Sequence, residues 1–331
     1  MNMKKIYITY IGLLAIILAG CSTADDVDSD MVHVKTIEMK GFEAVIESGT
    51  SQASTRGTVT TLGDYVGRNA FVANDQVVFT SIKRTASEIA AYTYTGISFN
   101  FDGSKWNKAG DTNLYWSDAT SGHTFIGYSL PQGTFDWTPS EGNYFGSIGN
   151  NGGDVVFSSS DDLKNEDLLI THNTTLTAQA CNGTPSLSFH HALSSVRVVL
   201  TISGIPSGTS ATVSDMTLLH QPTMYVWDQT GWDVKPITTE YQVRKNFKLW
   251  AASNTSNTFT YYGMVIPQSS TYLADYVLDT NKNAELTFKV TYTSTTPAST
   301  TNKTYSASQA NAVFEPGYNT TINISITAPT N

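Results

Sequence analysis

Cysteine is almost absent from this chain of 331 residues, which contains only Cys21 and Cys181. Cys21 closes an apolar run near the start of the chain, so Cys181 has no cysteine within the folded part with which to form a disulfide. The same shortage excludes a zinc site built from several cysteines. Stability must therefore come from hydrophobic cores or from a partner subunit.

Charged residues are also scarce, at 14% of the chain, and 28 acidic residues outnumber 19 basic ones. The formal net charge of −9 argues against nucleic-acid binding and against electrostatic docking on anionic lipid. After the first apolar run there is no second long one, so no other segment is predicted to span a membrane. Ser, Thr, Asn, Gly and Tyr make up much of the rest, as in extracellular all-β proteins with many turns.

The one apolar run, residues 6–18, follows two lysines and is too short to span a bilayer. It ends in the sequence Leu-Ala-Gly-Cys, which closes at Cys21. This is the pattern of a lipoprotein signal peptide, residues 1–20, that is cut before Cys21, and acyl chains on Cys21 would then anchor the mature chain. An ordinary signal peptide followed by a chance cysteine is the alternative.

The next segment, residues 21–56, is predicted to be a tether followed by a removable strand. Residues 22–30 are polar and acidic, so they fit a solvated linker, and they also resemble the surface-export signal of Bacteroidales lipoproteins. Between residues 32 and 46 apolar residues alternate in sets whose phase slips, which predicts a broken strand. Residues 48–57 have no apolar period and predict an exposed loop, in which Arg56 is accessible to an arginine-specific protease.

From residue 58 onward, short alternating stretches are separated by frequent turns. Ile97–Phe101 leads into Asp102-Gly103, a strong hairpin signal, and residues 318–326 alternate without a slip, whereas residues 132–165 read as long loops. No stretch sustains a helical period over three turns. We therefore expect an all-β fold with two antiparallel Greek-key β-sandwich (transthyretin-like) domains in tandem, at residues 57–191 and 192–331.

Two groups of polar residues could bind a metal ion. His190 and His191 are adjacent, but further ligands at suitable spacing are missing, and alternation places His191 on the core side of its strand. The acidic residues between 161 and 167 lack the spacing and glycine of an EF-hand calcium loop, so a solvated turn is favoured.

A group of aromatic side chains could stack on sugars or could fill a core, and the core interpretation is favoured. Its members are Trp106, Tyr115, Trp116 and Trp137. No nucleophile elbow, phosphate loop or paired-carboxylate signature is present. We predict that the protein is not an enzyme and that it has no catalytic residue, metal or cofactor.

The order of short motifs along the chain resembles the fimbrillin family of Bacteroidales, the Mfa-like and FimA-like type V pilins. The resemblance covers nearly the whole chain and starts with the lipobox, the broken strand and the Arg56 loop. The later motifs are Leu114–Trp116, Phe125–Pro131, Asp167–Leu169, Leu187–Ser194 and Phe314–Tyr318.

This resemblance implies a mechanism of assembly. The subunit is exported as a lipoprotein, and an arginine-specific protease cuts between Arg56 and Gly57 and removes the anchor with the first strand. The opened groove then accepts a strand from the next subunit, which is physically sound because an edge without its strand exposes backbone groups and apolar surface. The C-terminal run occupies the donor-strand position, or alternatively completes its own sandwich. Its alternating residues are Tyr318, Thr320, Ile322, Ile324 and Ile326.

The function expected from these observations is a structural or adhesive, non-enzymatic subunit of a surface fimbria at the outer membrane. Its expected partners are other fimbrial subunits, the outer membrane through the lipid anchor, and a host or bacterial surface ligand, but no nucleic acid. One alternative is an outer-membrane glycan-binding lipoprotein that never polymerises. Another is a glycan-degrading enzyme, which two apposed carboxylates about 5–10 Å apart in a cleft would favour.

Overall fold

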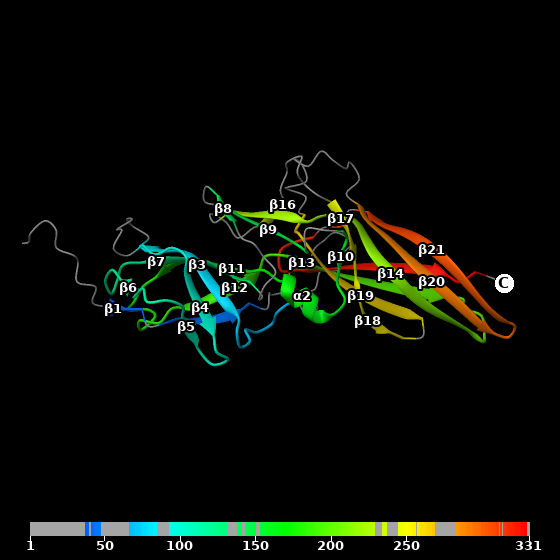
Figure 1. Cartoon of the computed structure of the whole chain (residues 1–331), viewed down its shortest axis with the longest axis horizontal. Helices are drawn as coiled ribbons and strands as arrows, with labels where there is room; N and C mark the ends of the chain where they lie inside the picture. Colours follow the sequence, from blue (N-terminus) through cyan, green and yellow to red (C-terminus); the bar gives the residue numbers. More distant parts are fainter. Residues whose placement is uncertain are drawn as a thin grey trace, which may run out of the picture. The chain divides into compact units, whose positions relative to one another are not determined.

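The computed structural model confirms the all-β class, since nearly all of its described secondary-structure elements are strands (Figure 1). Cys21, Arg56 and Gly57 lie outside the described residues. Among the residues described, no helix is long and apolar enough to cross a membrane. The described residues are 37–39, 41–47, 66–84, 93–130, 138–140, 143–149, 153–228, 234–236, 244–255, 257–268, 283–310, 312 and 314–329.

A seven-stranded sheet contains most of the strands that precede residue 192, in the order β2-β12-β11-β7-β3-β4-β5. On one face, alternate residues such as Val77 and Phe79 are buried in a first core that is rich in aromatic rings. β1 (Ile37–Glu38) and β6 (Tyr115–Trp116) form a separate two-stranded sheet. The strands of the large sheet are β2 (Glu43–Ile46), β3 (Gln76–Arg84), β4 (Ile97–Phe101), β5 (Trp106–Lys108), β7 (His123–Leu130), β11 (Leu169–Leu176) and β12 (Ser186–His191).

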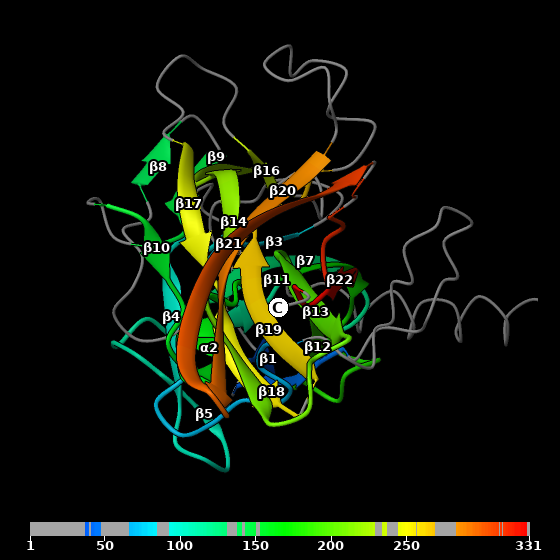
Figure 2. The same cartoon turned by 90° about the vertical axis from the view of Figure 1, so that its right-hand side faces the viewer.

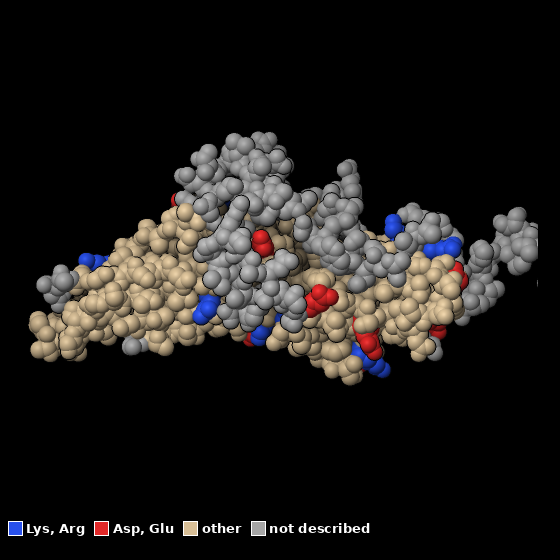
Figure 3. All heavy atoms as spheres, turned by 180° about the vertical axis from the view of Figure 1, so that it is seen from behind, with Lys and Arg blue, Asp and Glu red and all other residues tan. Residues whose placement is uncertain are grey.

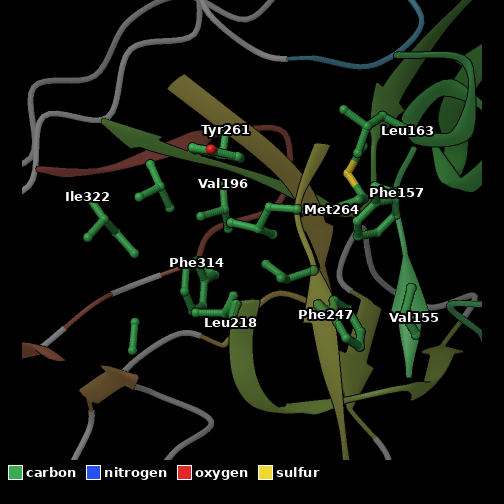
Figure 4. Packing of buried hydrophobic residues seen from close by; sticks show 14 of the residues in the cluster. Val155, Phe157, Leu163, Val196, Leu218, Phe247, Tyr261, Met264, Phe314 and Ile322 are labelled. Atoms are coloured by element: carbon green, nitrogen blue, oxygen red, sulfur yellow. The ribbon is translucent and has the colours of Figure 1, made fainter. Parts of the chain in front are cut away.

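Two further sheets enclose a second core, in which Val196, Leu218, Met264 and Ile322 lie together (Figure 4). The first has the order β18-β19-β13-β22 and the second the order β10-β17-β14-β20-β21. The four strands of the first are β13 (Ser194–Ser203), β18 (Trp250–Asn254), β19 (Thr258–Val265) and β22 (Asn319–Thr327). The five of the second are β10 (Val155–Val156), β14 (Thr209–Pro222), β17 (Arg244–Lys248), β20 (Asn283–Thr295) and β21 (Ala298–Ala310).

Strands from before residue 192 also pair with strands from after it. In a four-stranded sheet of order β16-β15-β9-β8, β9 (Asn143–Ser147) pairs with β15 (Met224–Asp228), and β10 pairs with β17. The other two strands of that sheet are β8 (Thr138–Ser140) and β16 (Val234–Pro236). Ile148, Val155 and Phe157 belong to the second core. The division into two tandem sandwiches at residues 191 and 192 stays a prediction.

The prediction of long loops over residues 132–165 is wrong, because β8, β9, β10 and the helix α2 (Ser160–Glu166) lie there. The helix also replaces the acidic turn that the sequence favoured. Its start is fixed by a capping box: the Asp162 N–H donates to Ser159 Oγ at 3.2 Å, and the Ser159 N–H donates to the Asp162 carboxylate at 3.1 Å. Seven residues are too few to produce a helical period in the sequence.

The last residue of α2, Glu166, is partly buried. Its Oε1 accepts a hydrogen bond from the Gly149 N–H at 3.2 Å, while its Oε2 has no hydrogen-bond partner among the described residues. Burial raises the pKa of Glu166 to about 7, although the bond from Gly149 opposes this and the charge of Asp162 adds to it. The carboxyl therefore titrates near neutral pH.

Three of the described ladders are parallel, although antiparallel sheets were expected: β2 with β12, β13 with β22, and β10 with β17. Each joins segments that are far apart in the sequence, so a tight hairpin does not dictate their direction. The remaining described ladders are antiparallel. Each of the three parallel ladders includes one end strand of its described sheet: β2, β22 and β10.

Candidate functional site

Residues 37–47, which precede Arg56, add strands to the fold at two places. β1 pairs antiparallel with β6, and the Met39 N–H donates to the Leu114 carbonyl at 2.8 Å. β2 pairs parallel with β12 and forms one end of the described seven-stranded sheet. The partners of both strands follow Arg56 in the sequence. We call residues 37–47 the leading segment.

Within the leading segment, β2 is an end strand that pairs with β12 alone among the described strands. Its ladder with β12 is extended by hydrogen bonds from the Glu43 N–H to Pro185 O and from the Glu47 N–H to Phe189 O, both 2.9 Å. The side chains of Ala44 and Ile46 pack against the first core, whereas Val45 is 53% exposed. One face of β2 is therefore buried and the other faces solvent.

Phe42 places a ring of the leading segment in the first core, and it is only 6% exposed. Its ring centroid lies 5.1 Å from that of Phe79 and 4.9 Å from that of Phe99, both edge to face. It also stacks on Trp106 at 5.0 Å with an interplanar angle of 21°. We call the space that Phe79, Phe99 and Trp106 form around this ring the Phe42 pocket. All three rings belong to residues that follow Arg56 in the sequence.

A buried polar cluster holds residues 66–75, which follow Arg56 in the sequence. The Arg68 N–H donates to Asp167 Oδ2 at 2.6 Å, and its guanidinium donates to the Asp167 carbonyl at 2.9 Å and to Ser129 Oγ at 3.0 Å. Arg68 Nη1 also lies 3.5 Å from Asp75 Oδ1. His191 Nδ1 lies 3.0 Å from both carboxylate oxygens of Asp167, which confirms the prediction of a core histidine. We call these five residues the Arg68 network.

The Arg68 network ties residues 66–75 to β7, to β12 and to the start of β11. Arg68, Asp75, Ser129 and Asp167 are each at most 7% exposed, so their charges and hydrogen bonds are shielded from water. Removing one partner of such a group is costly because it leaves an uncompensated buried charge. The chain after residue 66 therefore has an attachment to the sheet that does not depend on the leading segment.

The C-terminal strand β22 lies beside β13 in the same chain (Figure 2). The two strands pair in parallel from Ser195 opposite Asn319 to Ser203 opposite Thr327, and Ile322 and Ile324 are buried in the second core. Within the single chain, this run completes its own sheet. The residues predicted to form a donor strand, Tyr318, Thr320, Ile322, Ile324 and Ile326, are thus engaged in their own chain, and their use by a neighbouring subunit stays a prediction.

The side chains that suggested catalysis, metal binding or sugar binding have other surroundings. His190 Nδ1 lies 3.1 Å from Glu47 Oε2. Across the described ranges, no three His, Cys, Asp or Glu side chains gather in a group that could hold a metal ion. Trp106 and Trp116 are buried, as the core interpretation predicted, and Trp137 lies outside the described residues. On the described part of the face in Figure 3, charged side chains are few and scattered.

Sequence reasoning did not identify the Phe42 pocket or the Arg68 network. The alternation of Phe42, Ala44 and Ile46 indicated a buried face, but nothing local indicated which rings would surround Phe42. The sequence around Arg68 did not indicate a buried ion-pair network either, because the partner Asp167 is 99 residues away.

Comparisons with known proteins point to one family. The model of the fimbrillin-like family matches residues 55–331. No curated protein matches the chain significantly. A proposed cell adhesion protein of Bacteroides ovatus shares the fold with a TM-score of 0.50 and 13% identity, over 88% of this chain and 92% of that one.

Two other solved structures are less similar. A proposed cell adhesion protein of Bacteroides uniformis has a TM-score of 0.43 and 17% identity, over 83% of this chain and 94% of that one. The fimbrial anchor protein Mfa2 of Porphyromonas gingivalis has a TM-score of 0.34 and 7% identity, over 80% and 81%.

Proposed function

Because this chain belongs to the fimbrillin-like family, we propose that it is a structural or adhesive subunit of a surface fimbria, exported as a lipoprotein and assembled by strand exchange. The observation that carries this proposal is the leading segment. It is an end strand with one buried face, it lies before Arg56, and all its described strand partners lie after Arg56. The family supports a role in adhesion or assembly and not in catalysis.

In this proposal the subunit reaches the surface of the outer membrane on acyl chains attached to Cys21. Several chains on one residue anchor a protein stably, whereas one chain alone binds only marginally. The acidic tether, residues 22–30, then separates the folded part from the bilayer.

Cleavage between Arg56 and Gly57 is the proposed trigger of assembly. A cut there separates the leading segment from the rest of the chain, so that only non-covalent contacts hold it. Its departure exposes the β12 edge and the surfaces that Met39 and Phe42 cover, each at most 6% exposed before the cut. Reburying surface equivalent to two such side chains is worth roughly 3–6 kcal/mol. The opened subunit would therefore favour association with another strand.

The Arg68 network explains how the processed subunit could stay folded. Its residues all follow Gly57, so the contacts described above among Arg68, Asp75, Ser129 and Asp167 lie within the processed part of the chain. The new N-terminal part of the chain would remain attached to the sheet while the groove is open.

The incoming strand is proposed to be residues 318–326 of a neighbouring subunit. These residues pair in parallel with β13 in their own chain, just as β2 pairs in parallel with β12. The run would have to leave β13 before it could insert elsewhere, and the neighbour's groove would compensate for the lost pairing.

Replacement of Arg56 by Ala in the native cell tests this function. We expect a full-length, lipid-anchored monomer that forms no ladder of polymers on a gel of surface material. Ser54→Ala, two residues before Arg56 in the sequence, is the matched control and should be processed and assembled normally. Normal polymers from Arg56→Ala would contradict the mechanism, and the glycan-binding lipoprotein that never polymerises would then be the better account.

A further inference from the structure

We propose that the Phe42 pocket selects the incoming strand by an aromatic side chain, and that Tyr318 of a second copy of this chain supplies it in place of Phe42. This inference rests on the proposed function, since it concerns the groove that cleavage opens. It goes further by fixing the register: Thr320 would replace Ala44, and Ile322 would replace Ile46.

The first argument is the shape of the site. The three rings that form the pocket come from β3, β4 and β5, and their centroids lie 4.9–5.1 Å from that of Phe42. An alanine or valine in that position would leave a void that the surrounding rings could fill only by moving. The cost of a cavity grows with its volume, so a ring-sized side chain is strongly preferred.

The second argument is the pattern of the buried positions. Along the leading segment the core side reads aromatic, small, isoleucine at Phe42, Ala44 and Ile46. Residues 318–322 read aromatic, small, isoleucine with the same spacing. The intervening Val45, 53% exposed, corresponds to a threonine at position 321, which suits a face open to solvent.

The third argument is that the side chain of Tyr318 is not used by its own core. Ile322, Ile324 and Ile326 all contact the second core, but Tyr318 belongs to neither described hydrophobic cluster. Its backbone is nevertheless engaged, because its carbonyl accepts from the Ser195 N–H at 2.9 Å. An aromatic ring at this position contributes little to either core of its own chain and remains suitable for a partner.

The same pattern of an aromatic residue, a small residue and an isoleucine at alternate positions also occurs in residues 144–148 and in residues 7–11. Neither stretch is suited to act as the strand given to a neighbouring subunit. The first stretch overlaps β9, which is flanked by β15 and β8 in its sheet. The second lies in the predicted signal peptide. β22, which begins directly after Tyr318, is instead the last strand of its described sheet and is bound through one parallel ladder.

Peptide binding to the processed full chain tests the inference. The chain is cut with an arginine-specific protease, a new N-terminus at Gly57 is verified by sequencing, and labelled peptides are added in excess. The peptide of residues 37–47 reports whether the groove can open and rebind a strand. The peptide of residues 314–327 reports whether the C-terminal run fits it.

We expect both peptides to bind, and Tyr318→Ala in the second peptide to weaken its binding on the order of tenfold to a hundredfold. Tyr318→Phe should bind at least as tightly, because Phe42 itself has no hydroxyl that needs a partner. Thr321→Ala is the matched control, since it faces solvent in this register and should bind unchanged.

Each other outcome overturns one of the two proposals. If the peptide of residues 37–47 does not bind, cleavage opens no groove and the proposed function fails. If it binds while the second peptide does not, or while Tyr318→Ala binds as well as the parent peptide, the register proposed here is wrong. In the full-length protein, Tyr318→Ala should leave the melting temperature of the monomer unchanged and slow polymer formation.

Discussion

Phe42→Ala in the unprocessed chain should destabilise the folded protein strongly. The substitution removes a ring that is 6% exposed and that contacts three other rings, and it leaves a cavity in the first core. Phe→Ala changes in well-packed cores cost about 3–5 kcal/mol. A loss of that size should lower the melting temperature on the order of 10 °C.

The measurement is thermal and guanidinium unfolding of the unprocessed chain, followed by tryptophan fluorescence, to which Trp106 in the pocket contributes. Val45→Ala on the same strand is the control. Val45 is 53% exposed, so its free energy of unfolding should change by less than about 0.5 kcal/mol. If Phe42→Ala costs no more than this control, Phe42 is not a core residue and the pocket does not exist as described.

The same variant should also change what happens after cleavage. Once the chain is cut after Arg56, non-covalent contacts alone hold the leading segment, and they include the contacts of Phe42 with three rings. With alanine at position 42, the cleaved fragment should dissociate about a hundredfold faster or more, because about 3–5 kcal/mol of binding is lost. Equal dissociation rates for the two fragments would contradict the role given to the pocket.

Three further predictions concern other parts of the chain. Glu166 has a pKa of about 7 in the folded state, above its unfolded value of 4.5, so the folded state binds the extra proton between these values. Stability should therefore fall as the pH rises from about 4.5 to 7, and Glu166→Gln should flatten this slope in unfolding experiments, whereas an unchanged slope would exclude Glu166 as its source. Arg68→Ala should cost about 3–5 kcal/mol, because Asp75 and Asp167 stay buried without its charge; a loss below about 1 kcal/mol would argue against the network. Cys21→Ala should abolish palmitate labelling of the protein in the native cell, and persistent label would refute lipidation at this residue.

The local features of the fold could be predicted from the sequence. The turn at Asp102-Gly103 is the clearest example, since the Asp102 carboxylate accepts from the N–H groups of Ser104 and Lys105, and β4 and β5 pair across it. The slip in alternation before residue 42 correctly indicated a break, because β1 and β2 are separate strands in different sheets. Both signals arise within a few residues of chain.

The parts that could not be predicted depend on contacts between distant residues. β2 pairs with β12 near residue 189, and Arg68 pairs with Asp167, and no periodicity in either segment specifies these partners. The helix α2 was missed for a different reason. Its capping box at Ser159 and Asp162 was a usable local signal, but a seven-residue helix gives too weak a period to support it.

The central claim, that this chain becomes an assembled fimbrial subunit by losing its leading segment, is tested most directly by N-terminal sequencing of the protein in polymers sheared from the cell surface. The account predicts a subunit that begins at Gly57 and lacks the strand that carries Phe42. Polymers whose subunits begin at Cys21 would contradict it, since the Phe42 pocket would then still be occupied from within.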